Sequence, residues 1–303
     1  MKSFFLLLII SFCLSPLYGQ HLEINDPLLL DLVDEDSPVI KLSGGFQFTE
    51  GPVWNEQEQS LLFSDIPANT IYELQPTGEI NPFRKPSQNA NGLTFDKQGN
   101  LLMAEHGGRK ISSLSPEGNY STVVDNYEGV TLNSPNDVVT DSKGAVYFTD
   151  PPYGRPIDAT DTLSFNGIYK FENGKLLLIA DGLFRPNGLA LSPNERSLYV
   201  ANSGQPKMFM KYAVSKSGKV GKGKVFFDAS SLPGEGNPDG IKVDKEGNLF
   251  ATGPGGVLVL SPKGKHLGTI KFPETPANLA FGGPDMKTLF VTARTGLYSI
   301  RLK

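Results

Sequence analysis

One stretch of the chain reads Ser134-Pro135-Asn136-Asp137-Val138-Val139-Thr140-Asp141 and continues as Gly144-Ala145-Val146-Tyr147-Phe148-Thr149-Asp150. It starts with polar residues, runs into an alternating apolar strand, turns around Gly144 and returns as a second strand, which is the pattern of a β-hairpin. Variants of this unit recur along the whole chain. We therefore interpret it as one copy of a structural repeat.

Each copy begins with one residue, here called its head, that precedes the first apolar strand. The intervals between successive heads are 41, 45, 51, 52 and 38 residues, and the heads are Glu50, Asn91, Asn136, Asn187, Asp239 and Ala277. Strand repeats with this period are typical of propeller blades. Further strand candidates between the pairs bring each repeat to about four strands; examples are Thr70–Leu74, Gly167–Phe171 and Met208–Tyr212. The repeats predict an all-β fold, a six-bladed β-propeller with a central channel.

A closed propeller needs a partner for its last blade, because an open sheet edge invites aggregation. The apolar stretch Val39–Leu42 precedes the first repeat, and Gly296–Arg301 follows the last one. We expect these two segments to pair and close the ring. The propeller then occupies residues 20–303 as a single domain.

Residues 1–19 have the composition of a secretory signal. Lys2 precedes the apolar run Phe4–Leu14, which is too short for a stable membrane anchor, and a break follows it. A buried N-terminal strand is the alternative. The signal predicts export to the periplasm or the extracellular space, with no membrane association after its removal. Its loss would also remove Cys13, the only cysteine, so that no disulfide could form. We expect residues 21–37 to be a loosely attached lead-in.

The composition excludes several classes of function. The chain has 303 residues, 39% of them hydrophobic, which is enough for a sizeable core. Its formal net charge is −4 and no basic run occurs, so we expect no nucleic-acid partner. There is no nucleophile-elbow serine, His/Cys metal cluster, phosphate-binding glycine loop or dinucleotide fingerprint. The oligomeric state has no signal in the sequence.

The heads themselves have a composition that favours a cation. Five of the six are carboxylates or carboxamides, and the symmetry of a propeller brings them together at one end of the channel. Any single Asn or Asp here could simply be a turn residue, but Glu50 is not a turn former. Oxygen-only ligands suit a hard divalent cation, Ca²⁺ first and Mg²⁺ or Mn²⁺ next, with Zn²⁺ also possible. We therefore predict a metal site in the channel.

The same regions resemble the gluconolactonase/regucalcin (senescence marker protein) family from about Phe46 to the C-terminus. The resemblance rests on the motifs Thr49-Glu50-Gly51-Pro52-Val53-Trp54, Leu132-Asn133-Ser134-Pro135-Asn136-Asp137, Asp150-Pro151-Pro152-Tyr153-Gly154, Arg185-Pro186-Asn187-Gly188-Leu189 and Pro238-Asp239-Gly240. It implies a six-bladed propeller with a central calcium and lactonase activity. The metal ligands that it implies are Glu50, Asn136, Asn187 and Asp239, with Asn91 beside them. In lactonases of this type an Arg commonly precedes the Leu-Asn-Ser-Pro-Asn motif, whereas this chain has Thr131.

Two loops are candidates for contact with a substrate. One is Glu105–Arg109, in which His106 could move protons and Arg109 could hold a polar ligand. The other is the long insertion from Asp150 to Phe165, in which Tyr153 could stack on a ring. The alternatives are a polar loop without function and a stiffened, packed turn. The predicted substrate-binding residues are Asn91, Glu105, His106, Arg109, Asn133 and Tyr153.

These features together predict a metal-dependent hydrolase of sugar lactones, with a small-molecule lactone as its partner. The cation would polarise the lactone carbonyl for attack by water. Asp239 is the predicted catalytic residue, either as the base that accepts the proton of water or as a direct nucleophile. Two alternatives remain open: a non-catalytic binding propeller with a structural metal, and an esterase or phosphotriesterase that uses the same site.

Overall fold

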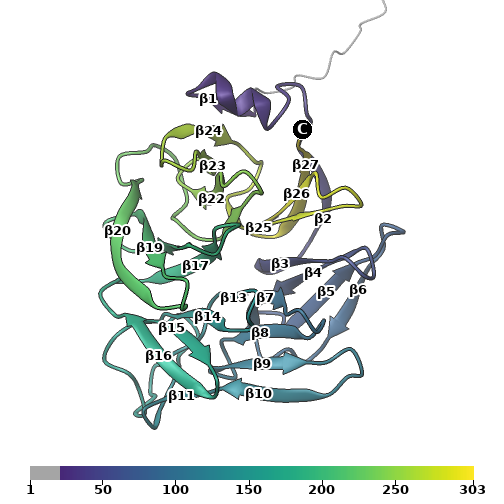
Figure 1. Cartoon of the computed structure of the whole chain (residues 1–303). Helices are drawn as coiled ribbons and strands as arrows, with labels where there is room; N and C mark the ends of the chain where they lie inside the picture. The colour runs from purple at the N-terminus through teal and green to yellow at the C-terminus, as the bar shows by residue number, and fades with distance from the viewer. Residues whose placement is uncertain (1–20) are drawn as a thin grey trace, which may run out of the picture.

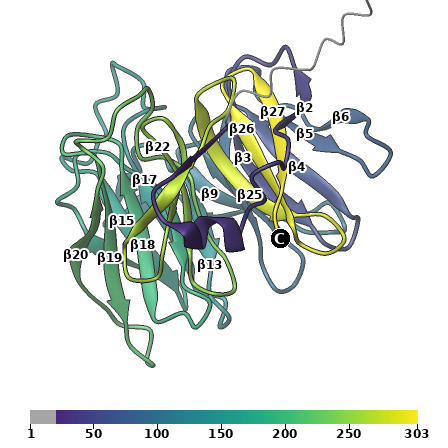
Figure 2. The same ribbon diagram turned by 90° about the horizontal axis from the view of Figure 1, so that it is seen from above.

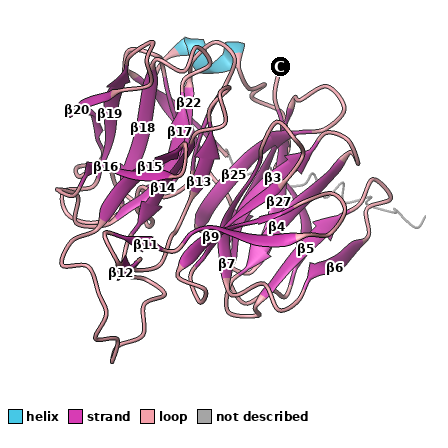
Figure 3. Ribbon diagram, turned by 60° about the horizontal axis from the view of Figure 1, so that its bottom comes forward, coloured by secondary structure: helices cyan, strands magenta, loops and turns pink. Residues whose placement is uncertain are grey.

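Six antiparallel β-sheets surround a central axis in the computed structural model, which describes residues 21–303 (Figure 1). The predicted all-β, six-bladed propeller is thereby confirmed. The proposed signal segment, with Cys13, lies outside the described residues. In residues 21–303 the only helix is a short 3-10 turn, η1 (Pro27–Asp31), coloured cyan in Figure 3. None of the helical structure in this part of the chain is long and apolar enough to cross a membrane.

Each blade is numbered by its place in the chain. Blade 1 consists of β3 (Thr49–Asn55), β4 (Ser60–Asp65), β5 (Thr70–Leu74) and β6 (Ile80–Arg84). Blade 2 consists of β7 (Ala90–Phe95), β8 (Leu101–Glu105), β9 (Lys110–Leu114) and β10 (Tyr120–Val124). Blade 3 consists of β13 (Val138–Thr140), β14 (Val146–Asp150), β15 (Gly167–Glu172) and β16 (Lys175–Ala180). A small hairpin before it pairs β11 (Asn126–Tyr127) with β12 (Val130–Thr131).

The second half of the ring repeats this arrangement. Blade 4 consists of β17 (Pro186–Leu191), β18 (Ser197–Asn202), β19 (Met208–Val214) and β20 (Val220–Asp228). Blade 5 consists of β21 (Ile241–Val243), β22 (Leu249–Gly253), β23 (Gly256–Leu260), β24 (His266–Ile270) and β1 (Leu22–Ile24). Blade 6 consists of β25 (Pro276–Gly282), β26 (Thr288–Ala293), β27 (Gly296–Arg301) and β2 (Ile40–Gly44).

The ring is closed by strands from both ends of the chain. Strand β2 pairs antiparallel with β27, with Ile40 opposite Ser299. This confirms the predicted closing strand near Val39–Leu42. A second N-terminal strand, β1, adds to the outer edge of blade 5 by pairing with β24. The N-terminal segment is therefore bonded to two neighbouring blades.

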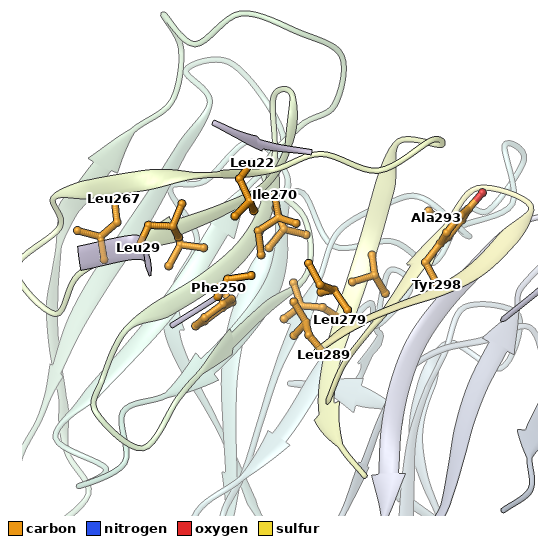
Figure 4. Packing of buried hydrophobic residues seen from close by; sticks show 14 residues of the cluster. Leu22, Leu29, Phe250, Leu267, Ile270, Leu279, Leu289, Ala293 and Tyr298 are labelled. Carbon is orange, nitrogen blue, oxygen red and sulfur yellow. The ribbon is translucent and has the colours of Figure 1, made fainter. Parts of the chain in front are cut away.

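The expectation of a loosely attached lead-in was wrong. Figure 2 shows the segment, in purple, running across blades 5 and 6. Leu22, Leu29 and Val33 are at most 2% exposed and belong to the apolar cluster between these blades (Figure 4). The backbone N–H of Lys303 also donates to the carbonyl of Leu32 at 2.9 Å. The short apolar run that looked like a linker is part of the core, because the outer strands of two blades leave a hydrophobic gap for it.

Apolar clusters fill the space between neighbouring blades. Each blade buries both faces of its sheet against its neighbours. The second strand of a blade is therefore a nearly continuous buried run, as in Ser60–Asp65 and Val146–Asp150. One hydrophobic cluster lies at each of the six blade interfaces formed by the described residues. This packing holds the inner strands in a fixed ring, and their first residues therefore have fixed positions relative to one another.

The N-terminal segment gives the first test. Leu29→Ala should lower the free energy of unfolding by about 2–5 kcal/mol, because it leaves a cavity in a fully buried cluster. Leu28→Ala is the matched control, since Leu28 is 54% exposed on the same helical turn and should change stability by about 0.5 kcal/mol or less. Thermal and urea unfolding would measure both. Equal effects of the two substitutions would contradict the assignment of the segment to the core.

Candidate functional site

The polar heads lie at the start of the inner strands, at one end of the channel. Glu50, Asn91, Asn136 and Asn187 are each at most 4% exposed. Asp239 is partly buried as a residue, and its Oδ1 is buried without a hydrogen-bond partner in the described part of the chain. We call these five residues the oxygen ring. The inner-strand starts that carry the predicted metal ligands are thus neighbours, and the side chains of Glu50 and Asn187 lie next to that of Asp239.

Hydrogen bonds from neighbouring blades fix the backbone of the heads. The hydroxyl of Ser64 donates to the carbonyl of Asn91 at 2.8 Å, and that of Thr149 donates to the carbonyl of Asn187 at 2.7 Å. Thr252 does the same to Ala277 at 2.9 Å. In each case a second-strand hydroxyl of one blade holds the head of the next blade. Sequence reasoning missed these residues, although a Ser or Thr near the end of the second strand was a visible repeat.

Two carboxylates share the ring. Glu50 Oε2 accepts hydrogen bonds from the Gly51 N–H at 2.8 Å and from the Asn278 amide at 2.9 Å, which leaves Oε1 for another partner. The carboxylates of Glu50 and Asp239 lie close enough for the charge of Glu50 to act on Asp239. Burial, followed by the charge of Asp137, raises the pKa of Glu50 to about 7. Burial, followed by the charge of Glu50, raises the pKa of Asp239 well above its usual range. The ring therefore lacks positive charge.

Neighbouring side chains orient two of the ring amides. Asn91 Nδ2 lies 3.2 Å from Nε2 of His106, and Asn91 Oδ1 is buried without a partner among residues 21–303. Burial lowers the pKa of His106 to about 4, so the imidazole is neutral at pH 7 and its Nε2 can accept from the amide. Asn187 Nδ2 donates to the Ser203 hydroxyl at 2.9 Å. Because protein groups hold the side-chain nitrogens of Asn91 and Asn187, the side-chain oxygens of these two residues are available to a ligand at the oxygen ring.

This donor set fits a hard divalent cation. Unpartnered oxygens of Asn91 and Asp239 are buried beside a second carboxylate, and each such group is costly unless it is paired. No three His, Cys, Asp or Glu side chains cluster as a metal site within residues 21–303. The ring has only two carboxylates, so the other ligands have to be amide oxygens. Two carboxylates with neutral amides balance the charge of a divalent ion.

The sixth head is displaced by one residue from its predicted place. Ala277 contributes only its backbone carbonyl, and the side chain that reaches the ring is Asn278, which holds Glu50. Ala277 has only a methyl group to offer, so the next residue supplies the polar side chain of this blade; the register shift between Pro276 and Asn278 has counterparts at the heads of blades 1, 2 and 4. In blade 3 the residue after the head, Asp137, is also buried, and its Oδ1 accepts from the Val138 N–H at 2.9 Å.

The insertion after β14 brings Tyr153 to the ring. The backbone of Gly154 lies against His106 so closely that a Cβ there would be 2.5 Å from the Cβ of His106. The Gly154 N–H donates to the Ser134 hydroxyl at 2.8 Å. The Tyr153 hydroxyl interacts with Ser203 and Asn187, although the side chain is 41% exposed. Tyr153 and His106 therefore both stand beside the oxygen ring.

Three other predicted substrate-binding residues have most of their polar groups engaged by protein. Glu105 is fully buried, and its Oε1 accepts hydrogen bonds from Ser112 at 2.5 Å and Tyr120 at 2.7 Å, whereas its Oε2 has no hydrogen-bond partner among residues 21–303 and lies 4.0 Å from Lys110 Nζ. The Arg109 guanidinium donates to the carbonyls of Thr131, Leu132, Asn133 and Asp161. Asn133 is fully buried, with bonds to Asp150, Phe165 and Arg155. These groups hold the loops around the ring, and we propose no substrate contact for them.

Asp150 is a further buried residue that the sequence left without a role. Its two carboxylate oxygens accept hydrogen bonds from the backbone N–H groups of Asn133 and Ser134, both at 2.8 Å. Burial raises its pKa to about 7. Thr131, which stands where related lactonases commonly have Arg, hydrogen-bonds through its hydroxyl to Asp161 of the insertion. The loop that carries Asn136 is therefore anchored from two sides.

Comparisons with known proteins identify the family of the chain. A sequence profile of the SMP-30/Gluconolactonase/LRE-like region matches residues 48–295. The chain belongs to this family. It is 37% identical over 305 residues to a gluconolactonase of Zymomonas mobilis, over 91% of this chain and 85% of the relative. A solved gluconolactonase from Xanthomonas campestris is 31% identical with a TM-score of 0.85, over 93% of this chain and 95% of the other.

A more distant structure shares the fold. The calcium-binding protein regucalcin from Agrobacterium tumefaciens is 20% identical with a TM-score of 0.74, over 87% of this chain and 94% of that chain. The family that the motifs predicted is confirmed, and the chain is a gluconolactonase-like hydrolase.

The electrostatics of the ring predict a pH dependence of stability. Without a cation, the folded state holds the Glu50 proton up to about pH 7, whereas the unfolded chain loses it near the ordinary value of 4.5. The folded state thus binds more protons between these values, and stability must fall as the pH rises through this range. In EDTA the melting temperature should decline from pH 5 to pH 7.5, and excess Ca²⁺ should reduce the decline.

Glu50→Gln is the variant that isolates this effect. Asp150 also has a raised pKa and contributes equally to both proteins. The difference in pH slope therefore reports on Glu50 together with Asp239, whose pKa burial and the charge of Glu50 raise. The slope in EDTA should be shallower in the variant. The same slope in both proteins would show that Glu50 does not carry an excess proton in the folded state.

Proposed function

We propose that the chain hydrolyses sugar lactones at the oxygen ring with the help of a bound divalent cation, Ca²⁺ first. The single observation that carries the proposal is the pair of buried, closely spaced carboxylates, Glu50 and Asp239, together with the amide oxygen of Asn91, which has no protein partner among residues 21–303. Relatives named gluconolactonase and pentonolactonase support a sugar lactone as the substrate. The structure described as calcium-binding regucalcin supports the choice of cation.

Glu50, Asn136, Asn187 and Asp239 would hold the cation, with Asn91 beside them. When bound, it would supply a Lewis acid for the lactone carbonyl. Hydrolysis adds water to the carbonyl carbon, breaks the bond to the ring oxygen and gives a hydroxy acid. The residues have to take one proton from water and return one to the ring oxygen.

We propose Asp239 as the group that takes the proton. Its Oδ1 is buried at the ring without a hydrogen-bond partner among residues 21–303. The same oxygen could instead attack the carbonyl carbon, with water releasing the acyl group in a second step. His106 is neutral and engaged with Asn91, so it orients a ring amide.

We propose Tyr153 as the group that donates a hydrogen bond to the substrate. Burial raises the pKa of its phenol above the usual value, so it is protonated at neutral pH. Its hydroxyl can therefore donate a hydrogen bond to a lactone oxygen at the ring, where it already meets Ser203 and Asn187.

The composition of residues 1–19 alone supports the further proposal that the enzyme is exported to the periplasm or the extracellular space.

Replacement of Asp239 tests the mechanism. Asp239→Asn keeps an oxygen ligand but removes the proton acceptor, so kcat for glucono-1,5-lactone should fall by about 100-fold or more. Asp285→Asn is the control, because Asp285 pairs with Arg301 on the surface and should leave kcat unchanged. Proton release measures the rate, and elemental analysis measures bound metal.

Two results would contradict the proposal. One is an Asp239→Asn enzyme that keeps its metal and the full rate, which would rule out Asp239 as base or nucleophile. The other is full turnover of lactones after EDTA has removed all metal while circular dichroism shows an intact fold. A native protein that binds the cation but hydrolyses no lactone would favour a binding propeller, and aryl esters or phosphotriesters assayed in parallel would detect the other hydrolase classes.

A further inference from the structure

Arg185 stands at the mouth of the oxygen ring on a rigid backbone. It directly precedes β17 and is two residues before the ring residue Asn187. Its N–H donates to Asn202 Oδ1 at 3.0 Å, and its carbonyl accepts from the Ser203 N–H at 3.0 Å. The residue is exposed, so its side chain is accessible from the mouth. The backbone is therefore fixed while the guanidinium remains open to a ligand.

Two aromatic side chains hold the guanidinium. Its central carbon lies 5.3 Å from the ring centroid of Tyr153 and 5.5 Å from that of Phe184. Phe184 is itself placed by Gly204, whose missing side chain leaves room for the aromatic ring. Cation–π contacts orient an arginine without occupying its five N–H donors. The guanidinium N–H groups of Arg185 are thus oriented and still free to donate hydrogen bonds to a ligand.

The guanidinium of Arg185 has no ion pair or hydrogen bond with any residue from 21 to 303. Other arginines on the same end of the propeller differ in this respect. Arg109 donates to four backbone carbonyls, and Arg294 lies 3.6 Å from Glu235. A positioned arginine without a protein acceptor suits a bidentate anion such as a carboxylate or a phosphate.

Tyr153 links Arg185 to the ring. Its aromatic face contacts the guanidinium, while its hydroxyl interacts with Ser203 and Asn187. Besides burial, the charge of Asp239 also raises the pKa of this hydroxyl. The two sites are thus separated by about the length of one aromatic side chain. A lactone whose carbonyl lies at the ring can reach Arg185 with a substituent on the other side of the sugar.

We propose that Arg185, stacked on Tyr153, is a subsite for the anionic substituent of a sugar lactone, either a carboxylate or a phosphate. The inference rests on the proposed function and narrows its substrate class to lactones that carry a negative charge away from the reacting carbonyl. A charge-assisted, bidentate contact contributes enough to favour such a lactone by about 10- to 100-fold over its neutral counterpart.

A comparison of charged and neutral lactones tests the subsite. The substrates are glucono-1,5-lactone, its 6-phosphate and the carboxylate-bearing glucaro-1,4-lactone, and kcat/KM is measured for each at fixed ionic strength. The native enzyme should prefer at least one anionic lactone, and the preferred one identifies the anion. Arg185→Gln should lower the anionic-to-neutral ratio by about 10- to 100-fold through KM. Arg185→Lys should keep part of the preference, because lysine retains the positive charge but lacks the planar guanidinium that can make two parallel hydrogen bonds to the anion.

Arg294→Gln is the matched control. It removes one positive charge from the same end of the propeller, at a residue that is already paired with Glu235. It should leave the ratio unchanged. A salt series should weaken the preference of the native enzyme, since the subsite is exposed and screened by ions.

Three outcomes would overturn the inference: a native enzyme without preference for either anionic lactone, an equal loss on charged and neutral lactones in Arg185→Gln, and an equal change of the ratio in Arg294→Gln. If no lactone is hydrolysed at all, the proposed function fails separately. Titration calorimetry then decides the subsite: 6-phosphogluconate should bind the native protein more tightly than gluconate, and Arg185→Gln should remove the difference. Equal binding of the two acids by the native protein would refute it.

Discussion

Closure of the ring is the constraint on which the site depends. Each blade buries both faces against its neighbours, and strands from the N-terminal segment complete blades 5 and 6. The inner strands therefore have fixed positions, and the heads of blades 1 and 5 hold two carboxylates, those of Glu50 and Asp239, close together. Like charges this close in a buried place destabilise the fold unless a proton or a cation compensates them. The same two carboxylates therefore affect both the stability of the scaffold and the chemistry of the site.

The repeats made most of the fold predictable. The spacing of the heads gave the number of blades, and the apolar stretch before the first repeat gave the closing strand that pairs with β27. The importance of the segment around Leu29 was not predictable, because its three leucines have no strand pattern and acquire a core position only when two blades meet. An apolar run without periodicity does not indicate which surface will cover it.

The sequence identified the ring better than it identified the mouth. The heads Glu50, Asn91, Asn136, Asn187 and Asp239 were visible because they recur at equivalent positions. The role of Asn278 in place of Ala277 was not visible, because every inner strand with a register shift at its head breaks the simple alternation of side chains there. Glu105, Arg109 and Asn133 are polar loop residues that resemble ligand contacts in a sequence. Only the folded structure shows which protein groups hold them: Asp161, Phe165 and Arg155 of the insertion contact Arg109 and Asn133, and Ser112 and Tyr120 of blade 2 contact Glu105.

Binding of a cation by the oxygen ring is the central claim, and anomalous diffraction from crystals soaked in Mn²⁺ tests it most directly. We predict one strong anomalous peak at the head end of the channel, about 2.1–2.5 Å from oxygen atoms of Glu50, Asn136, Asn187 and Asp239. A second soak of the Glu50→Gln variant should weaken this peak. Two results would contradict the account. One is well-ordered density for the oxygen ring without an anomalous peak, and the other is Mn²⁺ found only on the surface of the protein.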